Sequence, residues 1–324
     1  MRNGRRFGAW ATVAAILISA LPANAENVCS DNVIRIVSPF PAGGPTDVAA
    51  RMLAEKLKER LGQNVIVENR AGAGGATGTG YVAQQSGNGC TLLLAYDTHA
   101  VNPVLLTLPF DTLRAFKPVV MIGTIPNIIA ANPAQPFKTF DELVTAAKKE
   151  PDQLAYATGG TATVAHLSIK LIEQKYGFLL RNVPYRGGAP AAQDLIAGHV
   201  PLMAGSVQAL GNFVKEGKAR ALVQIGLKRH PMLPDTPTMD EIGMKGFSSA
   251  SWMGIFVPSA TPDPIVARYH DELKAVLADD WVKERMASMA VELSPGTSAE
   301  LGDFVKSELS RWGEVEKRYN IKVD

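Results

Sequence analysis

The sequence predicts two α/β domains, with the chain passing from the first domain into the second and later returning. Three observations predict this class. Short β-branched runs alternate with amphipathic helical segments over residues 33–95, and the alternation starts again after Pro126-Asn127 and continues to residue 226. The stretch from 264 to 319 is then helical. Such alternation is typical of parallel sheets covered by helices.

The first unit begins with a β-branched strand at residues 33–37, which ends at Ser38-Pro39. After a loop at 40–44 comes a helix that Gly62 ends, with apolar residues at spacings of three and four: Val48, Met52, Leu53, Leu57 and Leu61. The unit continues with a strand at 65–67, a glycine-rich loop, a short helix around 81–85 and a strand at 91–95.

The second unit repeats this order. We expect a strand at 128–130, followed by a helix at 140–149 with Thr139 as its N-cap. Further strands are expected at 154–157, 182–185, 200–204 and 219–226, with helices between them at 163–176 and 189–197.

Three helices are expected at the C-terminal end, at 264–277, 280–289 and 298–319. The last presents one broad apolar face made of Leu301, Val305, Leu309, Trp312, Val315 and Tyr319. The first unit has too few helices to cover its own sheet, so we expect this helix to return to it. The chain then crosses between domains twice, which gives domain 1 as residues 26–126 plus 246–324 and domain 2 as residues 127–245.

Length and composition limit the class of protein. The 324 residues are enough for about two domains, and a composition of 46% hydrophobic and 20% charged residues is that of a globular protein. Arg2, Arg5 and Arg6 precede residue 26, and no acidic residue does, which leaves 30 basic and 31 acidic residues afterwards. The chain therefore has no basic excess that would indicate nucleic-acid binding.

Residues 1–25 have the three parts of a signal peptide. Arg2, Arg5 and Arg6 precede an apolar run at 9–21 that is too short to span a bilayer, and Ala23-Asn24-Ala25 has the small-x-small cleavage pattern. We therefore expect an exported, periplasmic protein. No later apolar stretch approaches 18 uninterrupted residues.

The two cysteines, Cys29 and Cys90, are an even number in an oxidising compartment, which indicates one disulfide. Each precedes a strand of the first unit, and the first and third strands are neighbours in a doubly wound sheet. We therefore expect Cys29 and Cys90 to be bonded. No metal site is expected, because neither cysteine has a second ligand at zinc-type spacing and the five histidines are scattered.

Two loops have the form of a strand, then small residues, then a helix N-terminus: residues 40–47 and residues 158–163. Unpaired amides and the helix dipole favour an anion at such a junction. In the first loop Pro45 suits the first helical position, with Gly44 at the cap and Asp47 in the first turn. The glycines also suit tight turns alone, but one loop in each domain favours two anion-binding loops facing each other.

The glycine-rich segment 72–80 differs from a dinucleotide-binding fingerprint. Its third glycine position is Thr77, and it follows the second strand of its unit rather than the first. We interpret it as a structural loop with close backbone packing and expect no cofactor. Enzyme motifs of the Gly-x-Ser-x-Gly and His-Glu-x-x-His types are missing, and His166 lies on an apolar helix face, where a histidine is typically structural. We expect no catalysis.

The motifs together identify a family. In order they are Phe40-Pro-Ala-Gly-Gly-Pro-Thr-Asp47, Val67-Glu-Asn-Arg70, Val183-Pro-Tyr-Arg-Gly187, Leu233-Pro-Asp-x-Pro-Thr238, Trp252-x-Gly254 and Pro258-x-x-x-Pro262. This series resembles the Bug-type periplasmic receptors of tripartite tricarboxylate transporters, and the resemblance covers nearly all of the chain after residue 25.

The resemblance implies a type II periplasmic binding protein, with two α/β domains, two crossing segments and the ligand between the domains. It also implies a small-carboxylate ligand held by backbone amides of the two loops and delivered to a permease with one large and one small membrane subunit. A monomer is expected. The implied ligand-binding residues are Phe40, Ala42, Gly43, Gly44, Thr46, Asp47, Thr98, Thr158, Gly159, Gly160, Thr161, Tyr185, Gly205 and Ser206.

One departure from the family pattern bears on the ligand. Family members often carry a Phe-Asp pair where this chain has Ala204-Gly205. Without that carboxylate the site is less suited to an amino acid, and without the ring it has room for a bulkier acid, such as an aromatic or dicarboxylic acid.

Two other functions stay open. The same fold serves receptors that signal to a membrane sensor kinase when occupied, and the sequence does not separate signalling from transport. A periplasmic enzyme is disfavoured because no nucleophile–base arrangement is visible.

Overall fold

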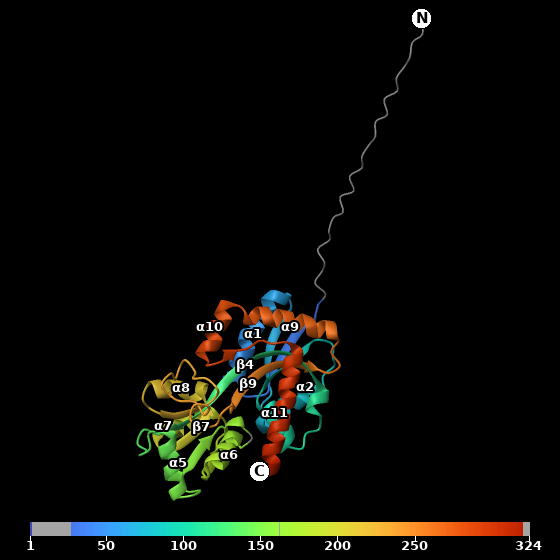
Figure 1. Cartoon of the computed structure of the whole chain (residues 1–324). Helices are drawn as coiled ribbons and strands as arrows, with labels where there is room; N and C mark the ends of the chain where they lie inside the picture. Colours follow the sequence, from blue (N-terminus) through green and yellow to red (C-terminus); the bar gives the residue numbers. More distant parts are fainter. Residues whose placement is uncertain (2–26, 162, 320–324) are drawn as a thin grey trace.

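The computed structural model describes residue 1, residues 27–161 and residues 163–319 (Figure 1). The expected signal peptide lies outside the described residues, apart from Met1. Within the described ranges no helix is both long enough and apolar enough to cross a bilayer.

The described strands form one continuous mixed sheet with the order β2-β1-β3-β9-β4-β7-β5-β6, and β10 and β8 also pair with β4. The strands are β1 (Val33–Ser38), β2 (Asn64–Asn69), β3 (Thr91–Tyr96), β4 (Phe116–Ala131), β5 (Ala155–Thr158), β6 (Arg181–Pro184), β7 (Leu202–Ser206), β8 (Arg220–Ile225), β9 (Ala250–Pro258) and β10 (Glu292–Leu293). The described helices are α1 (Pro45–Leu61), α2 (Ala76–Ala83), α3 (Thr98–Leu105), α4 (Thr112–Ala115), α5 (Phe140–Lys149), α6 (Val164–Tyr176), α7 (Gly188–Ala197), α8 (Val207–Lys215), α9 (Asp263–Leu277), α10 (Asp280–Ser288) and α11 (Ser298–Tyr319).

Strand β4 divides this sheet into two halves. Residues Phe116–Pro126 pair with β9, and residues Asn127–Ala131 pair with β7 and β8. The first half contains β2, β1 and β3 in parallel order, and the second contains β7, β5 and β6. The expected alternation of strands and helices is therefore present in both halves.

The sequence-based prediction was wrong about the strands that join the halves. Only residues 128–130 were expected as a strand, but β4 is 16 residues long, and β9 was not expected at all. The alternation was expected to start again after Pro126-Asn127, and residues 116–126 were assigned to no strand. In the structure, β4 runs through them, and its register shifts at Pro118/Val120 and Met121/Gly123, since such irregularities accommodate proline and glycine within a strand.

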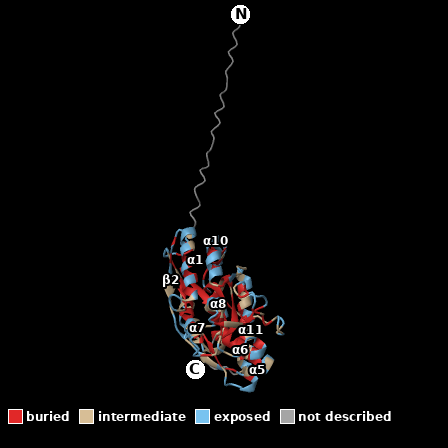
Figure 2. Ribbon diagram, turned by 90° about the vertical axis from the view of Figure 1, so that its left-hand side faces the viewer, coloured by how far each residue is buried: buried red, intermediate tan, exposed pale blue. Residues whose placement is uncertain are grey.

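Helices cover both faces of the sheet, with their buried sides toward it (Figure 2). In the first half, α1, α9 and α10 pack on one face, and α2, α3 and α11 pack on the other. Helix α11 returns to the first half as expected, because Leu301 and Val305 are buried there beside Trp252. In the second half, α5 and α6 cover one face, and α7 and α8 cover the other.

Local predictions near helix ends were accurate. The Thr139 hydroxyl accepts from the Glu142 amide at 3.2 Å, and Pro45 lies at the start of α1, which ends at Gly62 with φ of 65°. Two details were wrong. Val48 is 43% exposed, and α2 begins at Ala76 rather than near 81.

The glycine-rich segment packs closely, as expected. A Cβ atom added at Gly78 would lie 2.8 Å from the Cα atom of Pro39 and 2.7 Å from the carbonyl oxygen of Arg70. Glycine at this position allows α2 to lie directly against the ends of β1 and β2.

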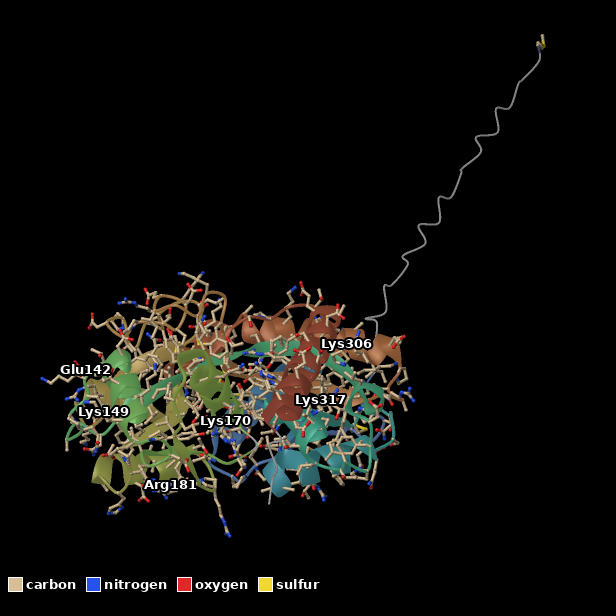
Figure 3. The ribbon with its side chains drawn as sticks, turned by 60° about the horizontal axis from the view of Figure 1, so that its bottom comes forward. Glu142, Lys149, Lys170, Arg181, Lys306 and Lys317 are labelled. Carbon is tan, nitrogen blue, oxygen red and sulfur yellow. A yellow bond between two sulfur atoms is a disulfide. The ribbon has the colours of Figure 1, made fainter. Side chains whose placement is uncertain are left out.

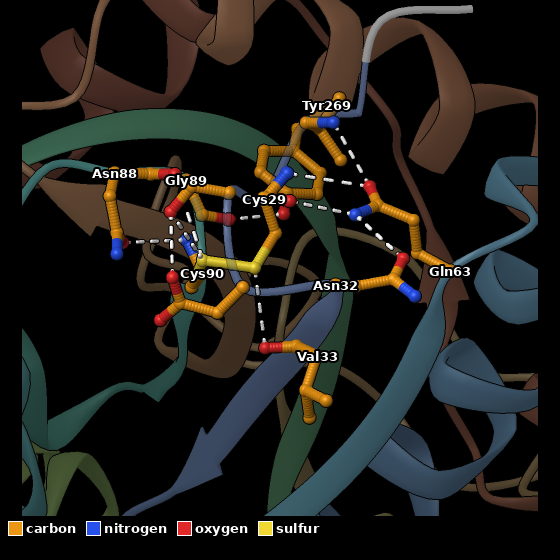
Figure 4. The surroundings of a disulfide bond; sticks show 11 residues. Cys29, Asn32, Val33, Gln63, Asn88, Gly89, Cys90 and Tyr269 are labelled. Carbon is orange, nitrogen blue, oxygen red and sulfur yellow. Dashed lines mark hydrogen bonds between the residues drawn. A yellow bond between two sulfur atoms is a disulfide. The ribbon is translucent and has the colours of Figure 1, made fainter.

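The disulfide between Cys29 and Cys90 is confirmed (Figure 4). Strands β1 and β3 are parallel neighbours, and the Arg35 amide donates to the carbonyl oxygen of Cys90 at 2.8 Å. Gln63 also holds the backbone beside the disulfide, because its Nε2 atom donates to the carbonyl oxygen of Cys29 at 2.9 Å.

Candidate functional site

The loop between β1 and α1 is held by Asp47. The Asp47 carboxylate accepts from the Gly43 amide at 2.9 Å, from Arg51 Nε at 3.0 Å and from Asn69 Nδ2 at 2.9 Å. Burial by itself would raise the pKa of Asp47, but these hydrogen bonds outweigh it and hold the pKa below its ordinary value. Asp47 is therefore an ionised group that shapes the loop from inside.

Some backbone amides of the loop of residues 40–47 have a hydrogen-bond acceptor within the loop, and others do not. The Gly43 amide is used by Asp47, and Gly44 at the N-cap has no side chain that could cap α1. In the part of the chain that the structure describes, the amides of Ala42, Thr46 and Asp47 have no acceptor. They are the donors that this loop could offer to an anion.

In the loop after β5, the carbonyl oxygens of residues 158–161 all accept hydrogen bonds. The carbonyl oxygens of Thr158 and Gly159 accept from the amides of Tyr185 and Gly187 at 2.9 and 3.1 Å. The carbonyl oxygen of Gly160 accepts from the hydroxyls of Thr158 at 3.2 Å and Thr163 at 2.9 Å.

The backbone amides of residues 159–161, unlike their carbonyl oxygens, have no hydrogen-bond partners among the described residues. Gly159, Gly160 and Thr161 are outside helices and strands, and their amides have no acceptor among the described residues. Gly160 has φ of 146°, a conformation that a residue with a Cβ atom adopts only under strain. Three successive amides next to the N-terminus of α6 form an arrangement suited to an anion.

Thr163, the N-cap of α6, and His166, in its first turn, support the loop of residues 158–163. The Thr163 hydroxyl caps the helix by accepting from the His166 amide at 3.3 Å. The Nδ1 atom of His166 lies 2.5 Å from the carbonyl oxygen of Thr161, and the residue is 4% exposed. The structural, hydrogen-bonded role expected for His166 is therefore what the structure shows.

Tyr185 and Ser206 are engaged within the second half. The Tyr185 hydroxyl donates to Asp194 Oδ2 at 2.6 Å, and this bond raises the pKa of Tyr185 to about 12. The Ser206 hydroxyl caps α8 by accepting from the Ala209 amide at 3.3 Å.

Ala204 and Gly205 are both buried. A Cβ atom at Gly205 would lie 2.7 Å from Met203 Cε and 3.7 Å from Leu210 Cδ1, beneath α7 and α8. Ala204 belongs to the apolar cluster on the opposite face. The ligand class inferred from this pair of residues stays a prediction.

Phe40 and Thr98 converge on Gly75. A Cβ atom at Gly75 would lie 3.2 Å from Phe40 Cζ and 3.4 Å from Thr98 Oγ1, and the Phe40 ring lies edge-on to Tyr96 with centroids 5.9 Å apart. The start of α3 at Thr98 and the start of the loop at Phe40 therefore both lie against Gly75.

One apolar cluster contains residues of α3, α6 and α11. Val101 of α3 belongs to the same cluster as Val164 and Leu167 of α6 and Trp312 of α11. Helix α11 contacts both α3 and α6, so it links the helix that begins at Thr98 to the helix that follows the loop of residues 158–163.

Two cavities lie elsewhere. One, of about 680 Å³, lies along the outer side of α6 and includes Lys170, which Figure 3 labels. The other, of about 400 Å³, lies between α4, α9 and α11. None of the predicted ligand-binding residues lines either cavity.

Sequence reasoning missed several residues that position the loops. Asn69 was part of a quoted motif but was given no role, although it bonds both Asp47 and the Phe40 carbonyl oxygen. Thr163 was expected only as the end of the second loop and the start of its helix, and Asn182 only as a strand residue, but both hold that loop by hydrogen bonds. The position of Thr163, a hydroxyl residue directly before an apolar helix, could have indicated its role as a helix cap. Nothing in the sequence around Asn182 indicates its bond to Thr158.

Comparison with known proteins agrees with this architecture. Residues 49–321 match the model of the tripartite tricarboxylate transporter family receptor. The protein BugT of Bordetella pertussis is 32% identical over 90% of this chain and 90% of its own length.

Solved structures are also similar. The periplasmic binding protein BugD is 35% identical, with a TM-score of 0.80 over 90% of this chain and 99% of BugD. An R. palustris protein solved with adipate is 30% identical, with a TM-score of 0.82 over 90% of this chain and 98% of that protein. MatC from Rhodopseudomonas palustris, with bound malate, is 30% identical, with a TM-score of 0.78 over 87% of this chain and 98% of MatC. The chain has the two-part α/β fold of these periplasmic binding proteins, and it belongs to the Bug-type family of tripartite tricarboxylate transporter receptors.

Proposed function

We propose that this protein is a periplasmic solute receptor that binds a small organic carboxylate and delivers it to a tripartite tricarboxylate-type membrane transporter. The observation that carries the proposal is the run of three amides at Gly159, Gly160 and Thr161, which have no acceptor among the described residues, while the carbonyl oxygens of residues 158–161 each have a donor. Relatives of this chain solved with adipate and malate support a carboxylate as the ligand.

In this proposal one carboxylate of the ligand accepts from the amides of residues 159–161 and from the first-turn amides of α1. Charge-assisted bonds to backbone amides are stronger than neutral ones, and two helix N-termini add a favourable field. Phe40, Thr98 and Tyr185 would contact the rest of the ligand.

We also propose the division into domain 1 (26–126 plus 246–324) and domain 2 (127–245). It is supported by the change of partners along β4 between Pro126 and Asn127, opposite the start of β9 at Ala250. Two strands that cross between the halves can act as a hinge, so the ligand would favour a closed form in which both loops reach it.

Residues 1–25 would direct export, and the partners would be the large and small membrane subunits of the transporter. Because the apolar run at 9–21 is short and Ala23-Asn24-Ala25 follows it, cleavage after Ala25 is the expected processing event.

The test is binding of adipate and malate, each compared with its dimethyl ester, to the purified chain without residues 1–25, measured by calorimetry. We expect at least one diacid to bind and its ester to bind at least tenfold more weakly, about 1.4 kcal/mol. An ester that binds as tightly as the acid would overturn the anion-binding mechanism. Chemical turnover of the bound acid would indicate an enzyme instead.

A further inference from the structure

Three buried, uncharged polar residues meet where the chain crosses between the two halves. Asn127 is the first residue of β4 that pairs with strands of the second half, and Ser249 directly precedes β9 in the second crossing segment, residues 246–249. Ser168 lies on α6. Each of the three is at most 1% exposed, and Figure 1 shows β4 and β9 side by side in this region. Buried polar groups of this kind need partners within the protein.

The backbone of Ser249 is bonded to the second half. Asn127 Nδ2 donates to the carbonyl oxygen of Ser249 at 3.2 Å. The amide of Ser249 donates to the carbonyl oxygen of Ile225, the last residue of β8, at 3.3 Å. The second crossing segment is therefore held by residues of β4 and β8 as far as Ser249, directly before Ala250 begins to pair with Pro126.

The side chain of Ser249 is bonded to α6, and the bond has a defined direction. Ser249 Oγ lies 2.5 Å from Ser168 Oγ, and Ser168 Oγ lies 2.6 Å from the carbonyl oxygen of Val164. A carbonyl oxygen only accepts and a hydroxyl has one proton, so Ser168 donates to Val164. The Ser249 hydroxyl therefore donates to Ser168.

Val164 is the first residue of α6 and directly follows the loop of residues 158–163. The same turn of α6 is bonded to that loop at two points. Thr163 Oγ1 donates to the carbonyl oxygen of Gly160 at 2.9 Å, and His166 Nδ1 lies 2.5 Å from the carbonyl oxygen of Thr161. The start of α6 is thus bonded to the loop on one side and to the second crossing segment on the other.

We propose that Ser249 and Ser168 are positioning residues of the carboxylate site, because they hold the start of α6, and with it the amides of residues 159–161, in a fixed place relative to the second crossing segment. Their role in binding rests on the function proposed above, whereas the restraint on the loop does not. When the halves rotate about the crossing strands, the loop moves together with the crossing segment. The ligand then meets amides that are already oriented, which lowers the ordering cost of binding.

The first measurement needs no ligand. Order parameters of the backbone amides of residues 159–161 are measured by NMR relaxation on the purified chain used for the binding test. Ser249→Ala and Ser168→Ala each remove the bond between the two hydroxyls. We expect both variants to lower these order parameters by at least about 0.1 from the value of about 0.85 that is typical of rigid backbone. Alanine favours a helix more than serine does, so Ser168→Ala does not loosen α6 through helix propensity.

Ser298→Ala is the matched control. The Ser298 hydroxyl donates to the carbonyl oxygen of Val119 at 2.7 Å, so it joins the start of α11 to β4 in the first half, as Ser168 and Ser249 join α6 to the crossing segment in the second. Its loss should leave the order parameters of residues 159–161 unchanged.

The second measurement is binding of adipate and malate by calorimetry. Ser249→Ala and Ser168→Ala should each weaken binding of the diacid that the wild type binds about tenfold, and Ser298→Ala should keep the wild-type affinity. The double variant Ser168→Ala/Ser249→Ala should bind no more weakly than the weaker single variant, because both substitutions remove the same bond. A role in stability alone would lower the thermal unfolding midpoint and leave the affinity unchanged.

Unchanged order parameters in both serine variants would overturn the proposal, whatever the chain binds. Additive losses of affinity in the double variant, or an equal loss in Ser298→Ala, would overturn the positioning role in binding. If the order parameters fall as expected while the wild type binds neither adipate nor malate, the restraint on the loop is supported and the proposed function fails.

Discussion

The Nδ1 atom of His166 lies 2.5 Å from the carbonyl oxygen of Thr161, at the end of the run of residues 159–161 whose amides have no acceptor within the described part of the chain. The bond links the first turn of α6 to the loop. It keeps the Thr161 carbonyl turned toward the helix.

His166→Leu should therefore weaken diacid binding about tenfold, because the loop loses the donor that fixes its orientation. His166→Asn should restore most of the affinity, since the Asn amide can donate to the same carbonyl. Dissociation constants for adipate and malate, measured beside thermal unfolding midpoints, separate a loop effect from general destabilisation.

His270 provides the matched control. Its Nε2 atom lies 3.1 Å from the carbonyl oxygen of Gly296, far from both loops in sequence and on a different helix. His270→Leu should leave the affinity unchanged. Equal loss of affinity in the two leucine variants would contradict the proposed role of His166.

Gly160→Val should abolish diacid binding while the protein stays folded. At φ of 146° a valine is strained by roughly 1–2 kcal/mol, and relief of that strain rotates the amides of the loop. The ligand-induced decrease in radius of gyration, measured by small-angle scattering, should disappear with binding.

Gly217→Val is the corresponding control, because Gly217 has φ of 70° in an open turn at the end of α8. Gly217→Val should lower the free energy of unfolding about as much as Gly160→Val does, and it should leave the affinity for the diacid unchanged. If wild-type protein binds a diacid with no change in radius of gyration, the closure mechanism is wrong.

Asp97→Asn should stabilise the protein increasingly as the pH rises. Asp97 is 1% exposed, and burial raises its pKa to about 7 against the hydrogen bonds from Ser251 and Thr98 that lower it. Between about pH 3.8 and 7 the folded chain holds a proton that the unfolded chain has released. The wild type therefore loses stability as the pH rises through this window, by at most roughly 1.4 kcal/mol per pH unit.

Urea denaturation of both proteins from pH 4 to pH 8 measures this difference directly, and other titrating groups cancel in the comparison. The gap in unfolding free energy should be smallest at pH 4 and largest above pH 7. A gap that does not change with pH would rule out a buried, protonated Asp97.

Trp312→Ala should cost about 3–5 kcal/mol of unfolding free energy. The ring is fully buried among Val101, Val164 and Leu167, and its Nε1 atom donates to Glu308 at 2.8 Å. Trp281, which is 39% exposed, is the control, and Trp281→Ala should cost less than about 1 kcal/mol. Similar losses in both variants would show that α11 does not join the halves through Trp312.

Much of the molecule follows from local sequence. The ends of α1 follow from Pro45 and Gly62, the start of α5 follows from Thr139, and α11 was predicted from Ser298 to Tyr319 by the spacing of its apolar residues. These features depend on residues within one or two helical turns, so a short window of sequence contains all the interactions involved. The motif order was likewise enough to indicate the family.

The tertiary structure decided how the halves join and how the loops are held. Strand β4 passes through Pro118, Gly123 and Pro126 because β9, more than 120 residues later, supplies its partner. Thr158 is held by Asn182, and Asp47 by Asn69, across separations of 24 and 22 residues. These hydrogen bonds fix the two loops, and they form only after distant segments pack together. For that reason the sequence predicted where the loops lie along the chain but not their geometry.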